Sequence, residues 1–400
     1  MVAAAVANKP AGAAQAGQAA PVRLPLFPVG VLRSENPDYD VTKLQSAANQ
    51  VQFDNHSFEP TGWLRGLWFQ FDMVTAANAA AVAYKEDGPF SVVQKITLKD
   101  KGNREVFGPL GGYDWMTINK YGAYHMVGDP RADLSFSIVA TAVATGGSFS
   151  FVLYLPMELC NRDALGAVEN KSSSSAWKSE LFMDTTANVY TVAPTTPGNL
   201  RCRITEDSYT EPAETDEHGR PLSQTPPAPG TLQYWVNESL ALGAGTQPYN
   251  VDNGIGYSIR NLIFKFIDTA AGTRAAGDAD WPDPATLTYG KVQLFQRFKN
   301  LWISKIGRYY GDNTPAVTTA AGVTTFNRDT AGGRENAVFP VWFTDDFQLQ
   351  PGAELRNGYL NTKVGTVLKL KGAYGLAGVL NVAVNYVIPP GNDPGRLRSG

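Results

Sequence analysis

The sequence predicts an all-β protein built from two tandem β domains, and three observations indicate this class. The 400-residue chain is rich in turn-forming residues, with 39 glycines and 26 prolines. Apolar and polar residues alternate in many short segments, which is the period of a half-buried strand. The chain is longer than one ordinary domain, and a strand pattern of its first half recurs in its second half.

The composition excludes several classes of protein. Lys and Arg number 34 against 37 Asp and Glu, a net charge of −3, so we expect no direct sequence-specific nucleic-acid binding. The hydrophobic fraction of 43% excludes general disorder. The two cysteines, Cys160 and Cys202, exclude a disulfide-stapled fold, although they leave one bridge open. We expect both to be reduced, in or near the core.

The pattern along the chain divides it into five parts. The beginning is rich in Ala, Gly and Pro and cannot bury enough surface to fold alone. A later stretch, EPAETDEHGRPLSQTPPAPG, holds five prolines and almost nothing apolar. The predicted parts are a flexible N-terminal arm (1–50), a first β domain (51–210), a linker or exposed loop (211–230), a second β domain (231–390) and a polar C-terminal tail (391–400).

Strands are predicted wherever apolar residues alternate over a short run. The segment 133–156 is the clearest hairpin, with its tight turn at Gly146-Gly147. A short helix is predicted within 157–169. The remaining predicted strands lie in 62–76, 91–100, 177–184, 200–210, 256–268, 298–306, 335–343 and, as a pair joined by a Gly-rich turn, 366–390.

An internal repeat supports two related domains. The segments LRGLWFQF (64–71) and IRNLIFKF (259–266) match at alternating positions, with Arg65 aligned to Arg260 at an offset of 195 residues. We therefore expect these two arginines to occupy equivalent places. A weaker match at an offset of 205 aligns the segment from Phe90 to Leu98 with the segment from Phe295 to Ile303.

The search for chemistry finds no catalytic, cofactor-binding or metal site, and we expect no enzyme. The three histidines lie far apart, and no HExxH, CxxC pair or P-loop motif is present. Neighbouring acids on a strand point to opposite faces, so neither acidic pair flanks a glycosidic bond unaided. The residues weighed are His56, His125, His218, Glu206-Asp207, Asp345-Asp346, and Asp278, Asp280 and Asp283 in one loop.

The order of arm, β domain, connecting loop, β domain and tail resembles a known family. Two local likenesses are FVLYLPMELCNRDALGAV (151–168) and GPFSVVQKITLKDKGNREV (88–106). Together they resemble the double jelly-roll major capsid proteins of tectivirus-like bacteriophages, which are tailless, contain double-stranded DNA and have an internal membrane. The resemblance covers roughly residues 45–390 at the level of pattern.

The resemblance implies two tandem eight-stranded jelly rolls and a homotrimeric, pseudo-hexagonal building block. Such blocks tile an icosahedral shell over the internal membrane, beside neighbouring capsomers, vertex (penton) proteins and minor capsid proteins. Residues 1–50 and 389–400 would lie at the base, where the arm contacts the membrane. The chain would be made in the host cytoplasm, act in the virion shell, and need no cofactor. Deleting residues 1–45 is expected to leave the folded oligomer intact and to impair shell assembly.

Two other classes remain open from the residues. One is a viral spike or lectin-like carbohydrate-binding β protein, in which Trp63, Trp235 and Trp281 would stack on sugars. The other is a glycan-active enzyme with β-sandwich domains. Binding to a glycan array, or hydrolysis of a glycan, would separate both classes from a capsid subunit.

Overall fold

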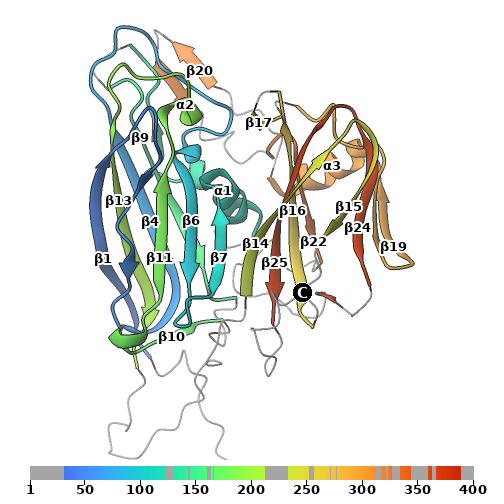
Figure 1. Ribbon diagram of the computed structural model, residues 1–400, viewed down its shortest axis with the longest axis horizontal. Helices are drawn as coiled ribbons and strands as arrows, with labels where there is room; N and C mark the ends of the chain where they lie inside the picture. The colour runs from blue at the N-terminus through green and yellow to red at the C-terminus, as the bar shows by residue number, and fades with distance from the viewer. Residues whose placement is uncertain are drawn as a thin grey trace, which may run out of the picture.

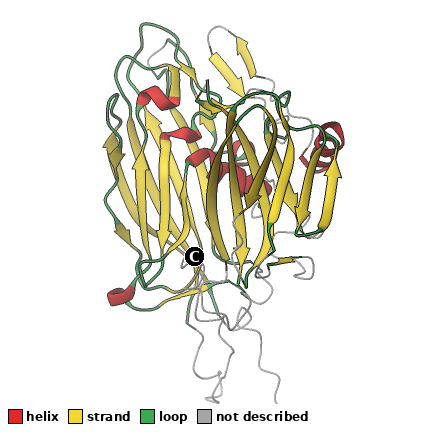
Figure 2. Ribbon diagram, turned by 45° about the vertical axis from the view of Figure 1, so that its right-hand side comes forward, coloured by secondary structure: helices red, strands yellow, loops and turns green. Residues whose placement is uncertain are grey.

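The computed structural model shows two β rolls standing side by side (Figure 1), the first at residues 33–209 and the second at 233–387. Strands make up most of both rolls, and the helices are few and short (Figure 2). The structure describes residues 31–122, 129–142, 145–159, 164, 166–211, 233–251, 256–270, 272–275, 277–310, 317–320, 323–326, 334–343, 359–362 and 366–388.

The first roll consists of two antiparallel sheets that enclose an apolar core. On β4, Leu67, Phe69 and Phe71 are fully buried between the sheets, whereas Trp68 and Gln70 on its outer face are half-buried. One sheet has the order β1 (Arg33–Leu44), β13 (Asn199–Tyr209), β4 (Gly62–Val74) and β9 (Phe149–Pro156), and the other has the order β2 (Val51–Gln52), β11 (Lys178–Met183), β6 (Val93–Lys99) and β7 (Glu105–Leu110).

The second roll repeats this arrangement strand for strand. In each roll the strands, numbered along the roll, lie in the orders 1-8-3-6 and 2-7-4-5, which confirms the predicted eight-stranded jelly rolls. Its first sheet contains β14 (Gln233–Leu242), β25 (Gly378–Val387), β16 (Ser258–Asp268) and β22 (Val338–Trp342), and its second contains β15 (Gly245–Val251), β24 (Leu368–Tyr374), β18 (Ala285–Tyr289) and β19 (Val292–Arg297).

Short elements connect and extend the sheets. The small strands are β3 (His56–Ser57), β5 (Ala83–Tyr84), β8 (Ser137–Ile138), β10 (Val168–Asn170), β12 (Tyr190–Val192), β17 (Thr273–Arg274), β20 (Val317–Ala320), β21 (Val323–Phe326) and β23 (Leu360–Asn361). The helices are α1 (Gly112–Tyr121), α2 (Thr186–Val189) and α3 (Lys299–Tyr310), with 3-10 turns at Phe90–Val92, Pro130–Ala132 and Ser173–Ser175. None of these described helices is long and apolar enough to cross a bilayer.

The boundary of the N-terminal arm differs from the prediction. β1 pairs with β13 along its whole length, from Arg33 opposite Tyr209 to Leu44 opposite Asn199, so residues 33–44 are the first strand of the first roll. The prediction was wrong here because β1 is an edge strand, whose charged side chains and Pro37 hide the strand pattern. Deleting residues 1–45 would therefore remove a strand. Residues 1–30 lie outside the described part of the chain.

One further predicted element needs correction. The segment 298–306, predicted as a strand, lies mostly in helix α3, where Trp302 and Ile306 are buried one helical turn apart. The middle of the segment 157–169, where a short helix was predicted, lies outside the described residues, and the end of that segment enters strand β10 (Val168–Asn170). The linker expected at 211–230 falls almost entirely outside the described residues.

The duplication inferred from Arg65 and Arg260 is confirmed. Both arginines lie on the third strand of their roll, and each is the residue skipped where the strand bulges against the eighth strand. Gly66 faces Asp207 across one bulge, and Asn261 faces Asn385 across the other. The 195-residue offset therefore holds at the level of individual strand pairs.

The weaker match at an offset of 205 is wrong. It aligns the 3-10 turn at Phe90–Val92 with the end of β19, and strand β6 with the start of α3, which are different parts of the roll. The structure instead aligns β7 and α1 with β19 and α3 at an offset of 187 without a gap. Trp115 and Trp302 mark this equivalence, because their indole nitrogens donate to the carbonyls of Tyr154 on β9 and Pro340 on β22.

Candidate functional site

The contact between the two rolls combines a backbone strand pairing, buried apolar side chains and a buried ionic network. Strand β7 of the first roll runs parallel to β14 of the second, with Phe107 paired to Trp235. This pairing joins the β2-β11-β6-β7 sheet of the first roll to the β14-β25-β16 sheet of the second, which gives one continuous 11-stranded sheet. The two rolls are therefore joined by strand pairing as well as by the connecting segment.

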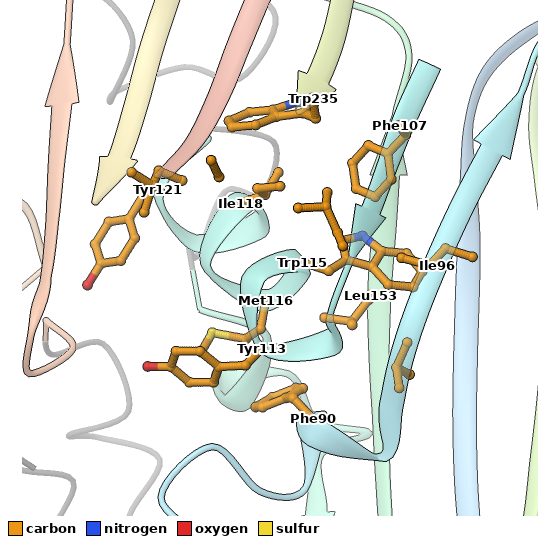
Figure 3. Close-up of a cluster of buried hydrophobic side chains, with 14 of the residues drawn as sticks. Phe90, Ile96, Phe107, Tyr113, Trp115, Met116, Ile118, Tyr121, Leu153 and Trp235 are labelled. Carbon is orange, nitrogen blue, oxygen red and sulfur yellow. The ribbon is translucent and has the colours of Figure 1, made fainter. Parts of the chain in front are cut away.

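Apolar side chains fill the contact beneath this pairing. Trp235 points toward helix α1, above Ile118 and beside Phe107 (Figure 3). All ten residues of α1 are buried, and Trp115 packs edge-on against Phe69 of β4, with ring centroids 4.9 Å apart. Helix α1 is thus held between the core of the first roll and the sheet of the second.

A buried ionic network crosses the same contact. Glu335, just before β22, accepts hydrogen bonds from Tyr113 (2.8 Å) and from the ammonium of Lys120 (3.0 Å), both on α1. It also pairs with Arg131. The Lys120 side chain has no solvent exposure, and its Nζ lies 2.7 Å from Asp129. A charge buried this deeply is tolerated only when several partners satisfy it.

Electrostatics favour the charged forms of this network. Burial disfavours the ionised form of Glu335, but Arg131, Lys120 and Arg274 together hold its pKa well below the ordinary value. Asp129 behaves alike: burial opposes its charge, and Arg131 and Lys120 lower its pKa. These carboxylates are therefore structural anions and not proton donors at neutral pH.

Further polar contacts extend the network to both sides. Arg274 of the second roll bonds to Glu86 (2.9 Å) and Asp87 (3.1 Å) of the first. Asp114 on α1 lies 2.5 Å from the Nζ of Lys265 on β16. At the end of α1, the backbone carbonyls of Tyr121 and Gly122 accept hydrogen bonds from Trp342 (2.9 Å) and Arg260 (3.2 Å). Side chains of the second roll thus satisfy the carbonyls that a helix end leaves unpaired.

The charged side chains of this arrangement hold one another in place. Lys120, Arg131 and Lys265 each have a carboxylate within hydrogen-bonding distance. Arg260 instead donates to the backbone carbonyl of Gly122 and to the side-chain carbonyl of Asn385. Among the described residues, no group of three or more His, Cys, Asp or Glu could hold a metal ion. The contact is built to set the relative orientation of two rolls.

Comparison with known proteins identifies the fold. No protein-family model and no curated protein matches the sequence. The crystal structure of the major capsid protein of STIV is similar over 90% of this chain and 98% of that chain, with 13% identity and a TM-score of 0.55. The atomic structure of Sulfolobus turreted icosahedral virus gives 12% identity over 90% and 91% of the two chains, with a TM-score of 0.55. The fold is a double jelly roll.

A third solved structure agrees. VP54 of PBCV-1, fitted into a cryo-EM reconstruction of the virophage Sputnik, is 11% identical over 89% of this chain and 93% of that chain, with a TM-score of 0.51. The chain therefore spans nearly the full length of these structures. The resemblance to double jelly-roll capsid proteins is confirmed at the level of the fold.

The double jelly roll does not bring the predicted candidate residues together. Nε2 of His56 lies 2.5 Å from Asp38 on β1, where the pair ties an edge strand to the roll. Cys202 is a free, buried thiol whose pKa is raised by burial, which makes it unreactive. His125, His218, Cys160, Asp345 and Asp346 lie outside the described residues.

The acidic candidates have structural roles. Glu206 is buried and accepts a hydrogen bond from Thr61 (2.8 Å), and burial with nearby Asp38 raises its pKa to about 8. Asp207 points elsewhere and holds Arg65 through both carboxylate oxygens (2.8 and 3.0 Å). Of the loop acids, Asp278 pairs with Arg334, and Asp283 accepts the backbone N–H of Lys299 at the start of α3.

The tryptophans considered for sugar stacking are not on the surface. Trp63, Trp235 and Trp281 are 4%, 1% and 2% exposed. Trp281 stacks on Phe339 with ring centroids 4.1 Å apart. These side chains are core and contact residues, so the observation that favoured a carbohydrate-binding protein is lost.

Proposed function

We propose that this chain is a viral major capsid protein whose homotrimer forms a pseudo-hexagonal block of an icosahedral shell. The observation that carries the proposal is the repetition of one roll within one chain, with the two copies locked together through a buried contact. Two such rolls give a chain two similar lateral faces. Three chains then supply six rolls, which is the shape that a hexagonal lattice needs.

The fold comparisons support this role, because similar structures belong to virus capsids. The finer parts of the proposal come from the family resemblance. They are a tectivirus-like bacteriophage shell over an internal membrane, neighbouring capsomers, vertex and minor capsid proteins as partners, and a place in the virion after synthesis in the host cytoplasm. The arm and tail would contact the membrane side of the shell. No catalytic role is proposed.

The native mass of the purified chain tests the trimer. Three copies of the 43.1-kDa chain weigh 129.3 kDa, so light scattering or native mass spectrometry should find a species at that mass. Electron microscopy of assembled particles should then show pseudo-hexagonal units. A monomer at every concentration, with no particles formed, would contradict the proposal.

A further inference from the structure

The two rolls differ in how much of their equivalent faces is covered. Helix α1 and strand β7 of the first roll are covered by the second roll, and every residue of α1 is buried. The equivalent elements α3 and β19 of the second roll have no such cover within the described chain, and β19 is a free sheet edge. The exposed apolar residues here are Val292 (61%), Leu294 (37%), Phe298 (64%) and Leu301 (49%).

The outer faces of β16 and β4, which are equivalent strands of the two rolls, differ in the opposite sense: the face of the second roll is covered and that of the first is not. On β16 of the second roll, Ile263 and Lys265 point outward and are buried against the first roll. Their equivalents on β4, at the offset of 195, are Trp68 and Gln70, which are only half-buried. β1, the equivalent of β14, is likewise a free edge. The described part of one chain thus leaves one face of each kind uncovered, and the two kinds of face fit each other where the two rolls of the chain meet.

Register places specific side chains opposite each other in such a contact. Glu35 is the equivalent of Trp235, because Glu35 faces Asp207 and Trp235 faces the equivalent Asn385. The offset of 187 makes Lys305 the equivalent of Ile118. The apolar contact of Trp235 with α1 would therefore be replaced by an acid and a base.

Charged residues at these two positions suit a face that is exposed to solvent until the chains assemble. Glu35 and Lys305 are exposed, and neither forms an ion pair with another described residue. The segment 291–308 carries five Lys and Arg and no acid, whereas Glu35 is an exposed acid on β1; Asp40, further along β1, is already paired with Arg201. Opposite charges of this kind steer association and fix register.

We propose that the first roll of a second copy docks on β19 and α3 in the arrangement that the second roll has on β7 and α1, with Glu35 of one copy beside Lys305 of the next. This inference rests on the proposed trimer and names its interface. The same head-to-tail contact, used three times, closes a ring.

Charge reversal tests the contact directly. Lys305→Glu alone and Glu35→Lys alone should each weaken the trimer at least about tenfold, because each places like charges together. The double reversal should restore its stability to near the wild-type value. Analytical ultracentrifugation over a dilution series, in urea below the unfolding transition, measures the trimer dissociation. Leu301→Glu should also weaken the trimer, and Leu134→Glu, at an 83% exposed leucine on the first roll, is its matched control.

A second measurement needs no variant. A zero-length carbodiimide cross-linker applied to mixed light and heavy isotope-labelled wild-type chains should join Lys305 of one chain to Glu35 of another. A wild-type trimer that is unaffected by all three interface variants, or whose cross-links between chains map elsewhere, would overturn the inference and leave the trimer standing. A wild-type chain that stays monomeric would overturn the trimer itself.

Discussion

Replacing Glu335 with glutamine is the most direct test of the contact between the rolls. The substitution keeps the shape of the side chain and removes the anion shared by Lys120, Arg131 and Arg274. Removing one partner of a buried ionic group costs about 3–5 kcal/mol. Lys120 and Arg131 keep Asp129 at 2.7 Å, and Arg274 keeps Asp87 at 3.1 Å, so we expect the lower end, about 3 kcal/mol.

Urea unfolding followed by tryptophan fluorescence measures this loss, since the chain contains eight tryptophans. Because the lost charge lies between the rolls, the variant should also separate the unfolding of the two rolls into distinct transitions. Glu180→Gln is the matched control: its partner Lys99 lies in the same roll, both side chains are partly exposed, and the cost should be about 1 kcal/mol or less. Equal losses in the two variants would refute the structural importance assigned to Glu335.

The remaining predictions concern pH, the repeat and the arm. Glu206 has a folded-state pKa of about 8 against an ordinary 4.5, so the free energy of unfolding should fall by up to about 1.4 kcal/mol per pH unit between these values; Glu206→Gln should flatten that decline in urea midpoints measured from pH 5 to 8. Trp115→Phe and Trp302→Phe should each lower the free energy of unfolding by about 0.5–1.5 kcal/mol, because each removes an indole N–H that donates to a buried carbonyl, although the carbonyl of Tyr154 keeps Asn119 as a second donor at 2.7 Å; a loss in only one roll would count against the equivalence. Deleting residues 1–30 should leave the thermal unfolding transition unchanged, whereas deleting 1–44 should lower it by removing β1 from β13; equal melting temperatures would show that β1 adds no stability.

The fold could be predicted because its information lies in local periodicity. Strand β4 and its equivalent β16 carry the same alternation and the same bulge arginine, and both features are visible in the sequence. Helix α3 was missed because KNLWISKI alternates over a few residues as a strand would. Its distinguishing signal is Trp302 with Ile306, a spacing of four residues that fits a helix face.

The contact between the rolls could not be predicted in the same way. Lys120 and Asp129 lie more than 140 residues from Arg274 and more than 200 residues from Glu335, and the fold alone brings these groups together. A single lysine in a helix, such as Lys120, is normally predicted to be exposed to solvent. The sequence offers one indirect signal. Trp115 and Trp302 are 187 residues apart, whereas Arg65 and Arg260 are 195 apart, so the connections between equivalent strands differ in length between the two rolls.

The continuous sheet across both rolls has a consequence for synthesis. When the ribosome has completed β13, the first roll has all its strands, but the β7 edge and the charged side chains of α1 still lack their partners. The last strand of the second roll, β25, ends at Val387, about 180 residues later, which takes about 10–40 s at roughly 5–20 residues per second. During that interval the nascent chain exposes an unpaired strand edge of the kind that chaperones bind and that aggregates. Expression of the first roll alone should therefore yield insoluble protein, so the gene is better expressed whole than in halves.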